Sequence, residues 1–245
     1  MSEFNIQVEG GTSVRLPTAG KYCDRDIIVT ATGGGGGDSL TPLLEGGIFN
    51  DEFISEVNVD LFRGWQYVRE IRLPNLITGT PNGYFCYGCT KLERVYMPKC
   101  TSFGAYSFYN NTSLTEIDFP SLTSVQGNCF RQCTSATSVN LPEVTSILAN
   151  GFQKDALIEK MDFPKLTSIA ATAFDQCSAL TTLIIRTSNC SLANVSAFNS
   201  TPIKSGTGYI YFYRADLDAY KTKTNWSTFS GQMRAIEDYP EITGG

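Results

Sequence analysis

Eight cysteines are the residues of this sequence best suited to chemistry, because a thiolate can act as a nucleophile or bind a metal. Two short spacings, Cys86-x-x-Cys89 and Cys129-x-x-x-Cys133, are similar to those of paired metal ligands. The sequence contains no histidine, however. This excludes the Ser-His-Asp and Cys-His arrangements of hydrolases and most zinc hydrolase sites.

Neighbouring carboxylates are the second group able to do chemistry. They occur in three pairs, which are Asp51/Glu52, Asp216/Asp218 and Glu237/Asp238. Two carboxyl groups can hydrolyse a glycosidic bond when one has a raised pKa beside a sugar-sized cleft. Nothing near these pairs indicates such an environment, so we expect solvated loops or helix faces. Gly206-Thr207-Gly208 has no phosphate-binding context. The sequence therefore predicts no catalytic residue and no cofactor.

The cysteines fall into an internal repeat of 22 residues. One column of the repeat contains Cys86, Phe108, Phe130, Phe152 and Phe174. A second contains Cys89, Asn111, Cys133, Asp155 and Cys177, and a third contains Leu92, Leu114, Ala136, Ile158 and Leu180. This period indicates a solenoid, whose turns bury their apolar faces only by stacking. We therefore expect buried structural thiols, with a metal site or a disulfide as the alternatives.

A short strand is predicted in every turn. The segments that alternate apolar, variable and apolar residues are 71–74, 95–98, 117–120, 139–142, 161–164 and 183–186. All but the last end in proline, which marks the end of a strand. A degenerate opening turn contains Phe62, Trp65 and Val68. We predict about seven turns of 22–24 residues with one parallel strand per turn, and a short helical segment at the phenylalanine column.

The repeated unit resembles a known family. Residues 163–169 (FPKLTSI) and 173–180 (AFDQCSAL) resemble the BspA-type leucine-rich repeat of bacterial and phage surface proteins. The resemblance covers residues from about 52 to 203, and the stretch from Tyr209 to Tyr239 is similar to the closing segment of such proteins. It implies a leucine-rich repeat solenoid with a C-terminal α/β cap. The glycine usual before the cysteine column appears only as Gly88.

The N-terminal segment differs in character from the repeats. Residues 5–8 and 27–30 are predicted strands joined through 16–22, and residues 33–37 are a run of glycine. The string LPTAGKYCDRDIIVTA resembles modules near the N-termini of phage tail and baseplate-associated proteins of gut Firmicutes phages. We predict a β anchoring module at 1–32, a glycine linker at 33–38, the solenoid at 39–207 and the cap at 208–245.

Charge and hydropathy narrow the partners. The net charge of −5 comes without a basic patch, which argues against nucleic acid. No run of about 20 apolar residues is present, so we expect no membrane insertion. The segment Met1–Asn5 lacks the basic and apolar regions of a signal peptide, which favours release by lysis.

Function must therefore come from the surface of the solenoid. The outward strand residues chosen as binding candidates are Arg72, Arg94, Tyr96, Glu116, Asp118, Asn140, Lys160 and Asp162. The neighbouring outward positions, Glu70, Ser138, Thr182 and Ile184, complete a face graded from basic through acidic to apolar. The alternative is a solvated face with no ligand. Solenoids commonly bind partners over broad surfaces.

The sequence leads to a non-enzymatic binding module without metal. The first hypothesis is a phage virion tail or baseplate appendage, assembled in the bacterial cytoplasm. Its N-terminal module would attach to tail or baseplate proteins, and its solenoid would bind a host surface protein or glycan. The second hypothesis is a bacterial cell-surface adhesin, and the third is a glycan-active enzyme. A homo-oligomer is compatible with each.

Overall fold

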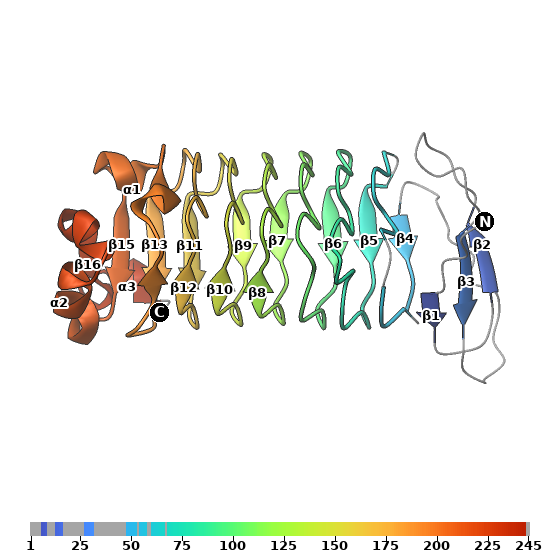
Figure 1. Cartoon of the computed structure of the whole chain (residues 1–245), viewed down its shortest axis with the longest axis horizontal. Helices are drawn as coiled ribbons and strands as arrows, with labels where there is room; N and C mark the ends of the chain where they lie inside the picture. Colours follow the sequence, from blue (N-terminus) through green and yellow to red (C-terminus); the bar gives the residue numbers. More distant parts are fainter. Residues whose placement is uncertain are drawn as a thin grey trace.

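The computed structural model describes residues 6–8, 13–16, 27–31, 48–52, 54–57, 60–66 and 68–243. From residue 48 onward the chain forms an elongated stack of similar turns (Figure 1). Each turn has one strand on a common side, which we call the strand face. The stack therefore has the solenoid architecture that the 22-residue period predicts.

Parallel strands form the strand face. In chain order they are β4 (Ile48–Asn50), β5 (Glu70–Arg72), β6 (Arg94–Tyr96), β7 (Glu116–Asp118), β9 (Ser138–Asn140), β11 (Lys160–Phe163), β13 (Thr182–Ile185), β15 (Tyr209–Phe212) and β16 (Met233–Ala235). They pair in the orders β4-β5-β6, β7-β9 and β11-β13-β15-β16. Ile71 and Ile117, at the centres of β5 and β7, are buried, whereas Arg72 and Asp118 are exposed. The predicted alternation is therefore confirmed.

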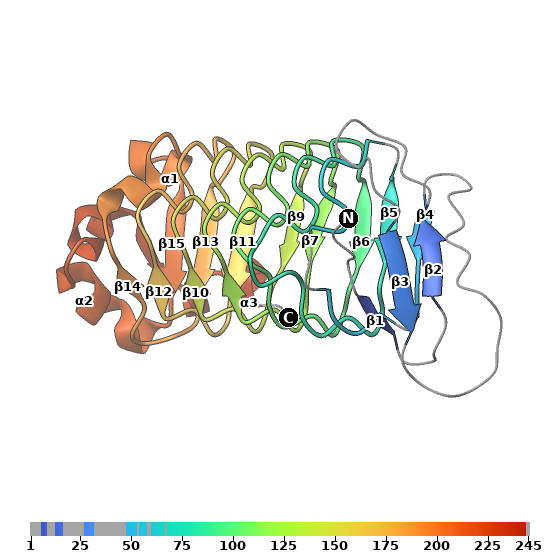
Figure 2. The same ribbon diagram turned by 45° about the vertical axis from the view of Figure 1, so that its right-hand side comes forward.

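A second parallel sheet corrects the prediction of one strand per turn. Its strands are β8 (Ser124–Val125), β10 (Ser146–Ile147), β12 (Ser168–Ile169) and β14 (Ser191–Leu192), in the order β14-β12-β10-β8 (Figure 1 and Figure 2). These strands are only two residues long. Their aliphatic residues, such as Val125 and Ile147, are buried. A two-residue strand is too short to show alternation in the sequence, which is why no strand was predicted at these positions.

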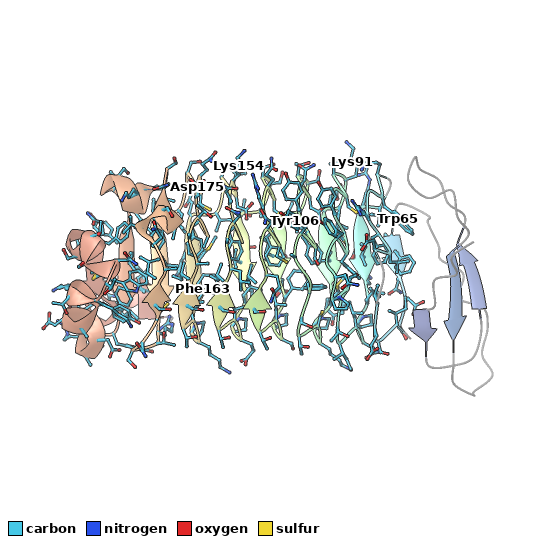
Figure 3. All side chains as sticks on the ribbon, in the orientation of Figure 1. Trp65, Lys91, Tyr106, Lys154, Phe163 and Asp175 are labelled. Carbon is cyan, nitrogen blue, oxygen red and sulfur yellow. The ribbon has the colours of Figure 1, made fainter. Side chains whose placement is uncertain are left out.

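The corners at Phe108, Phe130, Phe152 and Phe174 are tight turns, which corrects the helical segment predicted there, whereas a 3-10 helix (Val195–Phe198) leads to Phe198 in the last turn. Two positions per turn have positive φ, and one of these series is Gly88, Asn110, Gln132, Lys154 and Gln176. This is the glycine position of the repeat. Most L-residues disfavour the left-handed region, and a residue placed there interrupts a right-handed helix. Lys91, Lys154 and Asp175 lie along this corner edge (Figure 3).

A ladder of phenylalanine rings occupies the core. Phe62, Phe85, Phe108, Phe130, Phe152, Phe174 and Phe198 follow one another with ring centroids 5.3 to 6.1 Å apart. All are buried. The repeat spacing placed Cys86 in this column, but the ring of that turn comes from the preceding residue, Phe85. The burial predicted for this column is confirmed, and adjacent turns are joined through direct ring contacts.

Residues after the last predicted turn extend the stack. The helices are α1 (Pro202–Ser205), α2 (Arg214–Thr222) and α3 (Pro240–Thr243), and the 3-10 helices are η2 (Val195–Phe198), η3 (Trp226–Gln232) and η4 (Ile236–Asp238). Phe198 contacts Trp226 and Phe229, with ring centroids 6.2 and 5.1 Å away. Tyr220, Trp226 and Phe229, from the stretch that resembles a closing segment, are buried at this end of the core.

The N-terminal part contains three described strands, β1 (Ile6–Val8), β2 (Ser13–Leu16) and β3 (Ile27–Ala31). β3 pairs in parallel with β1 and antiparallel with β2. The first and last strands match the prediction, whereas β2 lies partly in the predicted connection. The glycine run and Cys23 fall outside the described residues.

Candidate binding surface on the strand face

The strand register aligns the outward side chains in two columns. One column is Glu70, Arg94, Glu116, Ser138, Lys160 and Thr182, and the other is Arg72, Tyr96, Asp118, Asn140, Asp162 and Ile184. All eight predicted binding residues belong to these columns. Seven of them are exposed and Asp162 is half-buried. The predicted outward orientation is therefore correct for these eight residues.

A depression of about 540 Å³ lies over β4 to β7. Its lining is Asn50, Glu52, Glu70, Arg72, Pro74, Arg94, Val95, Tyr96, Glu116 and Asp118. Five of the eight predicted residues meet here, while Asn140, Lys160 and Asp162 lie further along the face. The strand face is therefore hollowed at this end of the stack. A depression of this size is comparable to small-molecule and peptide side-chain sites.

Glu70 holds the two arginines of the depression in place. Its side chain is 7% exposed, and it accepts hydrogen bonds from Arg72 Nε at 2.5 Å and Arg94 Nη2 at 3.2 Å. The hydrogen bond from Arg72 lowers the pKa of Glu70 below its ordinary value. The carboxylate is therefore charged and both guanidinium groups are oriented before any ligand arrives. The Glu70-x-Arg72 spacing and an arginine on the next strand were the signal for this bracing role.

Tyr96 and the acidic residues form the rest of the depression. Tyr96 is 54% exposed, the largest exposed fraction among the large hydrophobic side chains described. Glu116 and Asp118 are exposed on the next strand, and Asn140 Nδ2 donates to Asp118 Oδ1 at 2.8 Å. An exposed aromatic ring beside oriented guanidinium groups is a typical element of a binding site, because both lose little entropy on binding.

The other end of the strand face is covered. Ile184 is fully buried, together with Tyr211, Ile236 and Ile242. The last two come from η4 and α3, and α3 lies against the sheet near β13 (Figure 1). The prediction of an exposed apolar end at Ile184 is therefore wrong. The apolar side chain there recruits the C-terminal segment of the same chain.

Arg186 links this covering segment to the face. It makes a bidentate ion pair with Asp162, with contacts of 3.0 Å from Nε and 2.7 Å from Nη2. Nη2 also donates to the carbonyl oxygen of Ile242 at 3.1 Å. Asp162, one of the eight predicted binding residues, thus orients the arginine that contacts the C-terminal segment.

Tyrosines on the corner loops form a separate cluster. Tyr84 stacks on Tyr106 and Tyr87 on Tyr109, with ring centroids 5.3 and 4.9 Å apart. Arg63 lies over Tyr84 at 4.7 Å. The stacked ring faces are therefore occupied within the chain, so this cluster stabilises the corners and offers little free surface for stacking a ligand.

The cysteines of the described residues are buried free thiols, as expected from the repeat. Burial raises the pKa of Cys100 to about 11 and that of Cys190 to about 12. It also keeps the pKa of Cys133 and Cys177 well above the ordinary value. Such thiols are protonated at neutral pH and react poorly. Within the described residues, no group of three cysteines and carboxylates has the arrangement to hold a metal ion.

Two carboxyl groups, those of Asp51 and Asp155, are buried, although a solvated position was predicted for Asp51 and is usual for aspartate. Asp51 is buried, and its Oδ1 accepts from the backbone N–H of Ile54 at 3.0 Å. The predicted solvated position is therefore wrong for Asp51, because a loop N–H needs this acceptor. Glu237 and Asp238 are exposed and bind Arg214. Asp155 is fully buried in the cysteine column, where burial raises its pKa well above the ordinary value.

The comparisons with known proteins agree with the repeat architecture. A family model described as BspA type leucine rich repeat region matches six copies, over residues 48–123 and 101–225. No curated protein matches the sequence. None of the matches shows the resemblance of the N-terminal segment to phage tail proteins. Among the helices of the described part of the chain, none is long and apolar enough to span a bilayer.

Two solved structures are similar to the chain. A leucine rich cell surface protein from Faecalibacterium prausnitzii A2-165 has 21% sequence identity and a TM-score of 0.43, over 76% of this chain and 48% of that one. A leucine-rich repeat protein from Bacteroides ovatus ATCC 8483 has 12% identity and a TM-score of 0.33, over 84% of this chain and 63% of that one. The chain thus spans about half of the first protein and less than two thirds of the second.

Proposed function

The chain belongs to the family of BspA-type leucine-rich repeat regions, and on this premise we propose that it is a non-enzymatic binding module that contacts its partner through the depression over β4 to β7. The partner is a protein or glycan of a host surface. The observation that carries the proposal is the buried Glu70, which orients Arg72 and Arg94 beside the exposed ring of Tyr96.

Bracing of this kind favours binding over a purely structural role. Ion pairs on a protein surface contribute little to stability, so orienting two exposed arginines has a small structural effect. The same arrangement reduces the conformational entropy that a ligand contact would otherwise cost. A non-catalytic role is supported by the protonated thiols and by the lack of histidine.

We propose the bacterial cell surface as the place of action. The phage tail hypothesis depends on features of the N-terminal segment, which lies before residue 48, where the family match begins. The solenoid, which contains the depression, is the part that the family match covers. Surface fractionation of the source bacterium tests this location, and immunolabelling of virions tests the phage alternative.

Binding of the fluorescently labelled full chain to epithelial cells tests the function. We expect Tyr96→Ala and Arg94→Ala each to reduce binding at least tenfold. Leu157→Ala and Lys165→Ala are matched controls, because Leu157 is 51% exposed and Lys165 carries the same charge, and both lie outside the depression. Equal binding by all four variants would contradict the proposal. Turnover in a polysaccharide hydrolysis screen would contradict the non-enzymatic role.

A further inference from the structure

The covered end of the strand face shows how this surface holds a peptide segment. Ile236 and Ile242 pack on Ile184 and Tyr211, which point outward from β13 and β15. Tyr239 meets Tyr211 edge to face, with ring centroids 5.2 Å apart and an interplanar angle of 83°. The segment therefore binds by placing an aromatic ring and aliphatic side chains on outward residues of the sheet.

A braced arginine supplies the polar part of this contact. Arg186 is held by the carboxylate of Asp162 and donates a further N–H to the backbone carbonyl of Ile242. A carbonyl group is present in every peptide. The contact therefore recognises the main chain of the segment, while the apolar residues recognise its side chains.

The open end contains the same two parts. Tyr96 and Tyr211 both point outward from the strand face, at the outward column that includes Arg72 and Ile184. Tyr211 is 6% exposed under the C-terminal segment, whereas Tyr96 is 54% exposed. Arg72 and Arg94 are braced by Glu70 as Arg186 is by Asp162. Each uses one N–H on Glu70, and a guanidinium group has five.

The two ends of the strand face differ in charge. Glu70 balances one of the two arginines, and Glu52, Glu116 and Asp118 add three further carboxylates to the lining. The depression is therefore acidic at its edges and favours a cationic ligand. The chain's own covering segment contains Glu237, Asp238 and Glu241, which suit the open end poorly.

We infer that the depression over β4 to β7 binds a cationic peptide segment of a partner protein. An aromatic side chain of the peptide packs on Tyr96, a backbone carbonyl accepts from Arg72 or Arg94, and a lysine or arginine lies beside Glu116 and Asp118. This inference rests on the proposed function, because it names the class of partner for the same site.

Fluorescence anisotropy with the full chain and synthetic peptides tests it. The probe has the sequence of residues 236–243 with Glu237, Asp238 and Glu241 replaced by lysine. The control peptides are the unchanged sequence and the lysine probe with Tyr239→Ala. We expect saturable binding of the lysine probe, at least tenfold weaker binding of both controls, and convergence of the lysine probe and the unchanged sequence at high salt.

Variants of the chain locate the bound peptide. Tyr96→Ala and Arg94→Ala are expected to weaken binding of the lysine probe at least tenfold, and Leu157→Ala to leave it unchanged. Absence of saturable binding up to millimolar peptide, or equal binding by Tyr96→Ala, would overturn the inference. If cell binding still depended on Tyr96 but was lost after glycosidase treatment, the site would be real and its ligand a glycan, so only the peptide inference would fail.

Discussion

The two ends of the strand face have the same strand geometry and opposite surfaces. Over β4 to β7 most outward side chains are charged and exposed, and they are arranged around a depression. Over β13 and β15 the outward residues Ile184 and Tyr211 are buried under η4 and α3. The backbone ladder does not distinguish the ends. What differs is whether the outward residues can bury apolar area against the chain's own C-terminal segment.

This difference shows how one sheet can serve both stability and recognition. Ile184 and Tyr211 are buried in the folded chain without any partner molecule, because the segment that covers them belongs to the same chain. Tyr96, in contrast, leaves an aromatic ring 54% exposed beside two arginines that Glu70 orients. Large exposed apolar groups beside oriented polar groups are typical of interaction sites.

Removing the residues that cover the C-terminal end of the stack should have the largest effect, which is on the solubility of the protein. Deletion of residues 209–245 exposes the edge of β13, Ile184 and the ring of Phe198, so we expect insoluble or oligomeric protein. Size-exclusion chromatography measures this outcome. The control is deletion of residues 1–37, which should leave a soluble, folded solenoid. A soluble monomer from the C-terminal deletion would mean that the closed end is unnecessary for solubility.

Matched substitutions in the same outward column should separate stability from binding. Ile184→Ala should lower the free energy of unfolding by about 2 to 4 kcal/mol, because this side chain is fully buried. Tyr96→Ala should change it by less than about 0.5 kcal/mol while reducing ligand binding. Urea unfolding measures both. Similar losses in the free energy of unfolding for the two variants would show that both ends of the strand face contribute to stability in the same way.

The buried carboxyl group of Asp155 can be compared with that of Glu70, which accepts hydrogen bonds from two arginines. Asp155 Oδ1 accepts from Cys133 N at 2.8 Å, whereas Oδ2 has no hydrogen-bond partner in the described part of the chain. Because burial raises the pKa of Asp155, its contribution is most favourable below about pH 4, the ordinary carboxyl value, and declines as pH rises toward the folded pKa. Asp155→Asn should therefore stabilise the protein by about 1 to 2 kcal/mol at pH 7.

Unfolding of wild type and Asp155→Asn from pH 4.5 to 8 checks this prediction. Asn111 occupies the equivalent position, where its Oδ1 accepts from Cys89 N at 2.9 Å and its Nδ2 has no hydrogen-bond partner among the described residues. Asparagine therefore keeps the backbone contact of the column without a charge. The advantage of the variant should grow with pH. A constant difference across this range would mean that Asp155 does not titrate as its burial requires.

Glu70→Gln should lower the stability of the protein only slightly. The pKa of Glu70 is lowered by the hydrogen bond from Arg72, so its stabilising contribution is present above the ordinary value near 4 and is lost as pH falls through the folded pKa. We expect a loss of about 1 kcal/mol or less at pH 7, because the paired arginines are largely exposed. Thermal unfolding at pH 7 and pH 3 should show this difference disappearing in acid. A difference that persists in acid would assign the effect to packing.

Much of the fold followed from local sequence pattern. The apolar alternation at Ile71, Ile117 and Met161 predicted the strands, since a half-buried strand has a period of two. The left-handed corners escaped prediction because residues such as Lys154 occupy the position where glycine is usual. The second sheet escaped because strands of two residues show no period.

The candidate site was predicted in part for a related reason. Outward orientation is a property of a single strand, so the eight binding candidates were found from sequence. Their grouping depends on neighbouring turns, which place Arg72, Arg94 and Tyr96 around one depression and leave Lys160 outside it. Glu70 was placed on the face but not among the candidates, because its role requires contacts with two arginines at once.

The sequence by itself determined the stacked repeat, the inward columns and the outward order of side chains, because each depends on spacing along the chain. Tertiary structure alone decided which part of the strand face is open. The covering of Ile184 and Tyr211 joins residues far apart in sequence, and its driving force is apolar area buried when η4 and α3 reach β13 and β15. Spacing within the repeat contains no information about that contact, because the covering segment lies after the last predicted turn.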